Sequence, residues 1–220
     1  MTYQLFWFFF FLLLLLVLIV ISEVLYKRFK WSAELSRKFL HVSGGLMCLC
    51  FPLIFKSHWW VLALTLIAFI LLLFTYISKM LPSVHQTKRY SLGSVLFPIP
   101  VYACFLISEI NNDYLFFYLP ITLLAISDTA AEIGGNRWGH LTKQFFRGQK
   151  TLAGSICFFI TALFANITWL YTGSHLSFTE MLLFGFLIAL LTTFTELVTL
   201  HGWDNLTVPA IAILFLSFLL

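Results

Sequence analysis

Long apolar stretches alternate with short polar stretches along the whole chain. Mean hydropathy is +0.97 and only 10% of the residues are charged, a balance typical of polytopic membrane proteins. A membrane-spanning helix needs roughly 20 predominantly apolar residues. We therefore predict an all-α polytopic membrane protein with about eight transmembrane helices in a single membrane-embedded domain over residues 1–220. The eight runs are Leu5–Ile21, Phe39–Phe55, Trp59–Ile77, Leu92–Ser108, Tyr114–Ile133, Leu152–Tyr171, Phe178–Leu200 and Leu206–Leu220.

The basic residues are shared very unevenly among the loops between these runs. Twelve of the thirteen Lys and Arg residues fall in alternate loops, and only Lys56 falls elsewhere. The positive-inside rule places such loops in the cytoplasm and both chain termini on the outer side of a cell or endoplasmic reticulum membrane. Met1–Ile21 lacks a basic start and a small-residue cleavage site, so we expect a retained helix there. The twelve residues are Lys27, Arg28, Lys30, Arg37, Lys38, Lys79, Lys88, Arg89, Arg137, Lys143, Arg147 and Lys150.

The fifth apolar run ends in a stretch that contains two carboxylates. Asp128 and Glu132 are four residues apart, which places both on one face of a helix, and Gly135 and Gly139 continue the same stripe. Carboxylates near membrane depth are costly and are functional by default. Pro120 precedes them in the same run and could kink or break the helix, which membranes tolerate where the freed backbone lines a cavity.

A second polar cluster precedes the second run. Glu34, Arg37, Lys38 and His41 follow a helical spacing that places them on one face, with Ser32 as a plausible N-cap. Binding to anionic lipid headgroups explains the three earlier cations well. It does not explain a histidine at the start of a span, aligned with two cations, so we expect a functional role there. The three earlier cations are Lys27, Arg28 and Lys30.

Two further clusters lie at later span boundaries. Lys150-Thr-Leu-Ala-Gly154-Ser155 is no Walker P-loop, but it offers a cation and backbone N–H groups at a helix start to an anion. Glu196 interrupts the seventh run and requires a partner, which would be a metal ion, a cation or a proton. Asp204 and Asn205 follow shortly after it.

The predicted topology brings all four clusters to the cytoplasmic face. They supply oxygen ligands for Mg²⁺, cations for phosphate groups, and glycines that allow close backbone approach. We therefore predict an intramembrane site that takes a nucleotide from the cytosol. The candidate metal ligands are Asp128, Glu132, Glu196, Asp204 and Asn205. The candidate nucleotide-binding residues are Gly135, Gly139, Lys143, Lys150, Gly154 and Ser155, with Arg147 as a further cation for phosphates. Arg37 and Lys38 are candidate catalytic cations, which would neutralise charge on the transferred group.

These motifs resemble those of the family of CTP-dependent polyprenol, phytol and diacylglycerol kinases, which includes dolichol kinase and is related to phosphatidate cytidylyltransferases. The resemblance runs in order from residue 37 to residue 209, nearly the whole chain. One departure is Ala153, where the family commonly has Glu, so the role of that acid is missing or falls to another residue such as Glu132. The matching motifs are Arg37-Lys38-x-x-His41, Asp128-x-x-Ala131-x-x-x-Gly135-x-x-x-Gly139-x-x-x-Lys143, Lys150-Thr151-x-x-Gly154-Ser155, Glu196 and Asp204-Asn205-Leu-Thr-Val-Pro209.

The resemblance implies transfer of the γ-phosphate of CTP, with Mg²⁺, to the hydroxyl of a membrane lipid alcohol such as a polyprenol, phytol or diacylglycerol. Phosphoryl transfer asks a protein mainly for positioning and charge neutralisation. Asp128, with Glu196 or Asp204, would hold Mg²⁺. The candidates for the base that accepts the alcohol proton are Asp128, Asp204 and His41, in that order.

Two alternatives stay open at this point. The same acids and cations would serve a phosphatidate cytidylyltransferase that makes CDP-diacylglycerol. A proton- or ion-coupled transporter could also use intramembrane acids, although the polar clusters are one-sided and no inverted repeat is visible. We expect membrane lipids and no nucleic acid as partners, and the sequence leaves the alcohol and the oligomeric state open.

Overall fold

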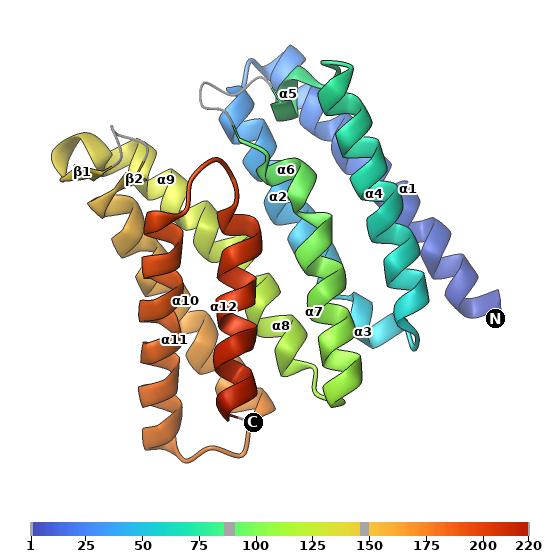
Figure 1. Ribbon diagram of the computed structural model, residues 1–220. Coiled ribbons are helices and arrows are strands. Elements are labelled where there is room, and N and C mark those ends of the chain that lie inside the picture. Colours follow the sequence, from blue (N-terminus) through green and yellow to red (C-terminus); the bar gives the residue numbers. More distant parts are fainter. Residues whose placement is uncertain (1, 86–90, 146–149, 220) are drawn as a thin grey trace.

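The computed structural model describes residues 2–85, 91–145 and 150–219, and most of these residues are helical (Figure 1). Two short strands pair antiparallel just before the sixth apolar run, with Phe145 opposite Lys150. The helices are α1 (Thr2–Phe29), α2 (Ala33–Cys48), α3 (Phe51–Ile54), α4 (His58–Ile77), α5 (Pro82–His85), α6 (Gly93–Leu96), α7 (Pro98–Asn111), α8 (Leu115–Thr122), α9 (Asp128–Trp138), α10 (Leu152–Gly173), α11 (Phe178–Val198) and α12 (Asp204–Leu219). The remaining elements are the π-helical segment η1 (Leu123–Ser127), the 3-10 turn η2 (Gly139–Leu141), β1 (Gln144–Phe145) and β2 (Lys150–Thr151).

Seven helical segments in the described ranges are long and apolar enough to cross a membrane. They are Thr2–Phe29, Ala33–Ile54, His58–Ile77, Gly93–Asn111, Leu115–Leu141, Leu152–Gly173 and Phe178–Val198. The last helix, α12, is apolar but has only 16 residues, which is about 24 Å at 1.5 Å per residue. The predicted all-α polytopic membrane protein is therefore confirmed, and an eighth span stays a prediction.

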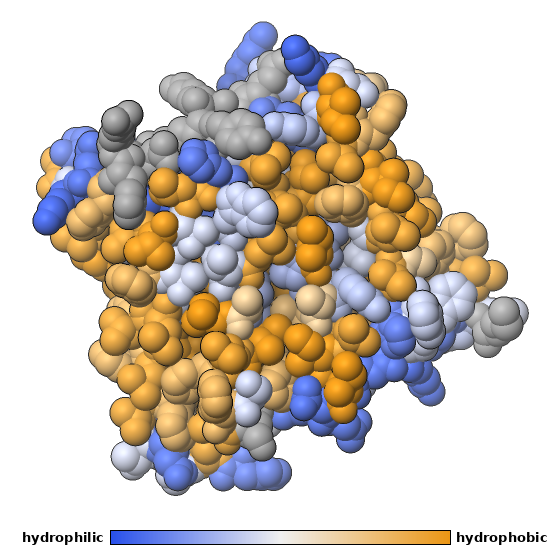
Figure 2. All heavy atoms as spheres, viewed as in Figure 1, coloured by the Kyte–Doolittle hydropathy of each residue, from blue (hydrophilic) through white to orange (hydrophobic). Residues whose placement is uncertain are grey.

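The outer surface of the bundle carries an apolar band. Figure 2 shows apolar residues over the middle of the viewed face, with hydrophilic residues gathered toward its two ends. Large apolar side chains on several helices are more than half exposed, including Phe74, Phe164 and Phe194. A bilayer, rather than water, is the solvent that suits such a band.

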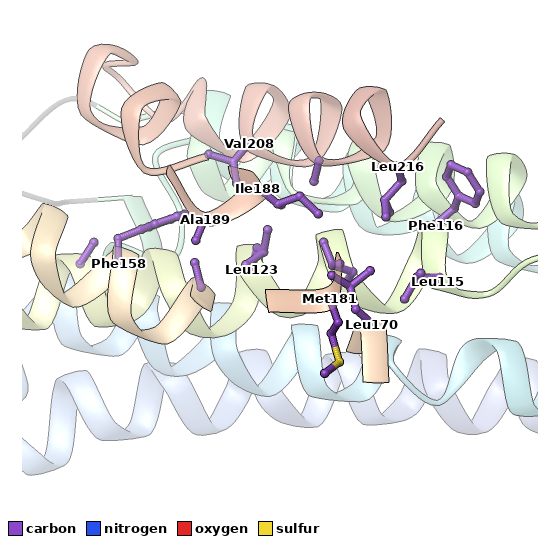
Figure 3. Packing of buried hydrophobic residues seen from close by; sticks show 14 residues of the cluster. Leu115, Phe116, Leu123, Phe158, Leu170, Met181, Ile188, Ala189, Val208 and Leu216 are labelled. Atoms are coloured by element: carbon purple, nitrogen blue, oxygen red, sulfur yellow. The ribbon is translucent and has the colours of Figure 1, made fainter. Parts of the chain in front are cut away.

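Helix α8 lies in the centre of the bundle and is buried on nearly all sides, whereas exposed residues appear in η1 and toward the end of α9. Leu119 packs into one apolar core with residues of α10, α11 and α12, such as Phe158 and Ile188 (Figure 3). On the opposite face of α8, Phe117 packs into a second core with residues of α1, α3, α4 and α7, such as Phe11. A helix that is apolar all round is favoured in such a buried position. The carboxylates that follow α8 therefore belong to Leu115–Leu141, the most buried of the seven candidate spans in the described ranges.

The chain ends at Thr2 and Leu219 lie at the same end of the bundle (Figure 1). The connections α1–α2, α9–α10 and α11–α12 lie at the opposite end. All four polar clusters adjoin these connections. The structure thus gathers at one end residues that are far apart in the sequence.

The helix changes its hydrogen-bonding pattern directly before Asp128. Pro120 lies inside α8, and η1 begins three residues after it. In η1 the N–H of Asp128 donates to the Leu123 carbonyl, five residues back, where an α-helix would use the Leu124 carbonyl. The expected interruption of this helix is present, as a widened turn rather than a break.

Two adjacent glycines of α2 provide a matched test of how α2 packs against η1. A Cβ on Gly45 would lie 2.4 Å from the Cβ of Ala125 in η1, whereas a Cβ on Gly44 would meet nothing within 4 Å. We expect Gly45→Ala to overpack this contact and lower the free energy of unfolding by about 1–3 kcal/mol. Gly44→Ala is the control and should not lower it. Thermal unfolding of both variants in detergent micelles measures the difference, and equal stabilities would contradict the α2–η1 packing.

Candidate active site

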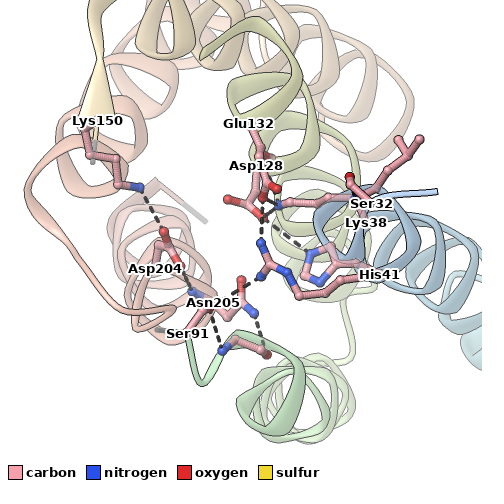
Figure 4. Close-up of polar contacts among 12 residues, drawn as sticks. Ser32, Lys38, His41, Ser91, Asp128, Glu132, Lys150, Asp204 and Asn205 are labelled. Atoms are coloured by element: carbon pink, nitrogen blue, oxygen red, sulfur yellow. Dashed lines mark hydrogen bonds and ion pairs between the residues drawn. The ribbon is translucent and has the colours of Figure 1, made fainter. Parts of the chain in front are cut away.

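A cavity of about 510 Å³ lies at the end of the bundle where the polar clusters meet. Residues from α2, α9, α11, α12 and the start of α10 line it, so the predicted convergence of the clusters is present in the structure. Figure 4 shows Lys150 and Asp204 on one side, with Asp128, Glu132 and Lys38 on the other. The predicted site residues in its lining are Arg37, Lys38, Asp128, Glu132, Gly135, Lys150, Gly154, Ser155, Glu196, Asp204 and Asn205.

The first charged group joins α2 to α9. Lys38 Nζ lies 2.6 Å from Asp128 Oδ2 and 3.1 Å from Glu132 Oε2. Arg37 Nη2 lies 2.8 Å from the same Glu132 oxygen. Two cations therefore compensate two carboxylates, which is how a membrane protein makes acids at this depth tolerable.

The second charged group joins the start of α10 to α11 and α12. Lys150 Nζ lies 2.5 Å from Glu196 Oε1 and 2.9 Å from Asp204 Oδ2. Burial alone would lower the pKa of the Lys150 ammonium, but the carboxylates of Asp204 and Glu196 outweigh it and raise that pKa above its usual value. Lys150 is therefore a cation at neutral pH. With both carboxylates ionised, the group has two negative charges and one positive charge.

His41 links α2 to the widened turn before Asp128. Its Nε2 lies 2.9 Å from the oxygen of the Leu124 carbonyl and 3.6 Å from Asp128 Oδ2. The Leu124 carbonyl is the one to which the Asp128 N–H would donate in a regular α-helix. A carbonyl only accepts, so Nε2 carries the proton in this contact. The ring therefore positions Asp128, and its Nε2 is not free to accept a proton from an alcohol.

The first turn of α10 uses its backbone N–H groups within the protein. The Leu152 N–H donates to the Lys143 carbonyl, the Ala153 N–H to Thr142 Oγ1, and the Gly154 N–H to Thr151 Oγ1. Thr151 is thus the N-cap of this helix. These three N–H groups thus have partners within the protein, while Lys150, Gly154 and Ser155 line the cavity, and their role in binding a nucleotide stays a prediction.

The glycines between α9 and α10 have packing roles. A Cβ on Gly139 would lie 2.7 Å from Thr151 Cγ2, and a Cβ on Gly154 would lie 2.8 Å from the Ala131 carbonyl oxygen. Gly139 is buried outside the cavity lining, while Gly135 and Gly154 line it. Close packing of the turn after α9 against the residue that caps α10 therefore explains Gly139 without a nucleotide.

The remaining residues named from the sequence have separate outcomes. Ser32 caps α2 as predicted, because its Oγ accepts from the Leu35 N–H. Lys143 is exposed beside the Phe145 ring, 5.4 Å from its centroid, and is not brought into the cavity lining. Asn205 lines the cavity but donates its side-chain amide to the Gly93 carbonyl at 2.6 Å. Arg147, Lys88 and Arg89 lie outside the described residues.

The contact between α6 and the α11–α12 loop was not foreseen from the sequence. Gly202 has a φ of +87°, and a Cβ on it would lie 2.3 Å from the Gly93 nitrogen. The Leu92 N–H donates to the His201 carbonyl at the same contact. Only glycine suits such a left-handed, closely packed position. The glycine at position 202, between two apolar runs, was the sequence signal that could have predicted a tight turn there. This contact forms the wall of the cavity between α6 and α12.

Comparison with known proteins gives two similarities. No protein-family model matches the chain, and no solved structure matches it. CTP-dependent diacylglycerol kinase 1 of Saccharomyces cerevisiae is 32% identical over 119 residues, which are 45% of this chain and 40% of the yeast protein. Phytol kinase of Synechocystis sp. is 25% identical over 202 residues, which are 86% of this chain and 82% of that protein. Both relatives are lipid kinases. The similarities support a relationship of this chain to lipid kinases.

The second charged group makes a prediction about stability. Lys150→Met would leave Glu196 and Asp204 without their cation, and loss of one partner of a buried pair costs about 3–5 kcal/mol. Adding Glu196→Gln removes one of the two stranded charges and should recover part of the loss. Thermal unfolding of both variants tests this, with Lys56→Met at the exposed opposite end as the control. Wild-type stability of Lys150→Met would contradict the assigned ion pairs.

Proposed function

We propose that the protein transfers the γ-phosphoryl group of a nucleoside triphosphate to the hydroxyl of a membrane lipid alcohol. The cavity that gathers two charged groups at one end of an apolar bundle supports this proposal. A water-soluble nucleotide can enter from the adjoining aqueous phase, and a lipid alcohol can enter from the bilayer. Cytidylyltransfer to phosphatidate would use similar groups and is separated from the kinase reaction by the assay below.

One observation carries the proposal further than the charges alone. Among the buried polar side-chain atoms without hydrogen-bond partners in the described residues, three belong to residues that line the cavity. They are the donor Arg37 Nε, the acceptor Glu196 Oε2 and the hydroxyl of Ser155. A buried donor without an acceptor suits an anion, and a buried carboxylate oxygen without a donor suits a cation. A metal–triphosphate complex supplies both at once.

The carboxylates fit magnesium when a nucleotide completes the coordination. No group of three His, Cys, Asp or Glu side chains in the described part of the chain is placed to hold a metal ion without help. Mg²⁺, however, is usually held by one or two carboxylates together with substrate phosphates. Glu196 and Asp204 are the pair we assign to it, because they outnumber their cation. When bound there, Mg²⁺ would offset the negative charge of the phosphates.

The remaining charged residues divide the chemistry among them. Lys150 would stabilise the phosphates from one wall of the cavity, and Arg37 and Lys38 from the other. Asp128 is the carboxylate we assign as base. The alcohol oxygen forms a bond to the γ-phosphorus as the bond from that phosphorus to the bridging oxygen breaks. The hydroxyl proton passes to Asp128, and the nucleoside diphosphate leaves.

CTP is the proposed donor, and the cytoplasm is its proposed source. The yeast relative is named as CTP-dependent, and the motifs resemble those of CTP-dependent kinases. The uneven distribution of Lys and Arg favours a cytoplasmic location for the loops beside the cavity. Both chain ends would then lie on the outer side.

The direct test is an assay of the purified protein with Mg²⁺ and γ-labelled CTP or ATP. Phytol, polyprenols, diacylglycerol and phosphatidate serve as acceptors. We expect label in the phosphate of an alcohol and more of it with CTP than with ATP. Labelled pyrophosphate formed with phosphatidate would establish the cytidylyltransferase reaction instead, and no turnover with any lipid would favour a transporter.

Asp128→Asn tests the assignment of the base. The substitution removes a carboxylate while leaving Lys38 its second partner, Glu132, so the fold should persist. We expect kcat to fall at least ~100-fold, the size of effect seen when one catalytic polar group is removed. The control is Lys56→Ala, far from the cavity, which should retain wild-type kcat. A wild-type rate in Asp128→Asn would show that another group takes the proton.

A further inference from the structure

A second, apolar cavity runs beside the polar one. It has a volume of about 70 Å³ and is lined by residues of α1, α2, α4 and α7, among them Phe11, Leu64 and Val101. Thr65 is a polar residue in this lining, but its hydroxyl donates to the Val61 carbonyl of its own helix. The walls below the charged end therefore present hydrocarbon, which excludes phosphate groups and admits an aliphatic chain.

One face of α2 forms the length of this slot. Arg37, His41, Gly44 and Cys48 line it at intervals of three or four residues, so they share one side of the helix. At 1.5 Å per residue, the distance from residue 37 to residue 48 is about 16 Å. The slot therefore reaches about halfway through a hydrocarbon layer of about 30 Å.

The two cavities meet at the charged end of α2. Arg37 belongs to the lining of both. His41 lines the slot, and its Nε2 lies 3.6 Å from the Oδ2 of Asp128, which lines the polar cavity. The His41 ring also packs edge-on against Phe97, with centroids 4.7 Å apart, so it stands at the boundary between the two spaces. A hydroxyl at the end of a chain in the slot would lie beside Asp128.

We propose that this slot binds the hydrocarbon chain of a single-chain lipid alcohol and delivers its hydroxyl to Asp128. The proposal rests on the function proposed above and names the acceptor class. Its support is that Arg37 lines both cavities, that His41 of the slot lies 3.6 Å from Asp128, and that the slot is small. Its volume is about 70 Å³, against about 510 Å³ for the polar cavity. We therefore expect the slot to take one hydrocarbon chain rather than the two of diacylglycerol.

Gly44 is the residue that keeps the slot open at mid-length. A Cβ there meets no other atom within 4 Å, although the residue is buried. A larger side chain at this position would extend into the slot without displacing the protein. Neighbouring Gly45 differs, because it packs against Ala125. The absence of a side chain at Gly44 therefore leaves room for a long chain to pass toward Cys48.

The experiment measures kcat/KM of Gly44→Phe for single-chain alcohols of increasing length, from citronellol through farnesol to phytol. We expect a loss of about tenfold or more for phytol, a size typical of lost contacts in an apolar pocket, and a change within about twofold for citronellol. Leu46→Phe, on the exposed outer face of α2, is the control and should keep the wild-type profile. An equal effect of Gly44→Phe on all lengths would overturn the proposal, as would no effect.

A second measurement separates this proposal from the proposed function. A long-chain alcohol with a photoactivatable group at its far end is cross-linked to the wild-type protein, and the labelled peptides are mapped. We expect label on α2 and α4 near Met47 and Leu64, competition by phytol, and loss of label in Gly44→Phe. Label spread over the exposed apolar surface, or equal competition by diacylglycerol, would overturn the slot. Labelling as expected without turnover of any alcohol would refute the kinase and leave the slot established.

Discussion

The structure depends on the compensation of carboxylates that lie at membrane depth. An isolated charge in a bilayer costs several kcal/mol, so each acid requires a cation from elsewhere in the chain. Lys38 meets Asp128 across α2 and α9, and Lys150 meets Glu196 and Asp204 across α10, α11 and α12. These pairs tie together helices that are distant in sequence. The requirement that makes the acids tolerable thus also builds the walls of the cavity.

The backbone before Asp128 determines where that carboxylate lies. The π-helical turn leaves the Leu124 carbonyl without its usual donor, and His41 supplies one. Gly45 allows α2 to approach the same turn closely enough for this contact. Such widened turns are frequent at functional sites, and here one places Asp128 in the lining of the polar cavity, 3.6 Å from His41 of the apolar slot.

Much of the fold and part of the site could be predicted from the sequence. Hydrophobic runs are a strong signal in a membrane protein, because backbone groups there must be paired within helices. The distribution of basic residues indicated which loops share one end of the bundle. The position of Glu196 inside an apolar run indicated that its carboxylate needs a partner. The identity of that partner could not be read, because Lys150 lies 46 residues away and the pairing arises only from the packing of α10 on α11.

Other features were hidden for equally physical reasons. A π-helical turn has no reliable sequence pattern, so Pro120 indicated only that the helix would be interrupted. Glycines allow both phosphate binding and helix packing, and Gly139 packs against Thr151. The start of α10 had the composition of an anion site, but Thr151 and Thr142 already accept hydrogen bonds from its N–H groups.

The central claim is that the far-separated polar clusters form one nucleotide site that opens to the cytoplasm. Asn136, an exposed residue in the lining of the polar cavity, reports on it directly. In a variant whose four native cysteines are alanine, Asn136→Cys would be treated with a membrane-impermeant maleimide on inside-out and right-side-out vesicles. The account predicts modification from the cytoplasmic side that Mg²⁺ and CTP together slow. Modification from the outer side, or a rate unaffected by Mg²⁺ and CTP, would contradict it.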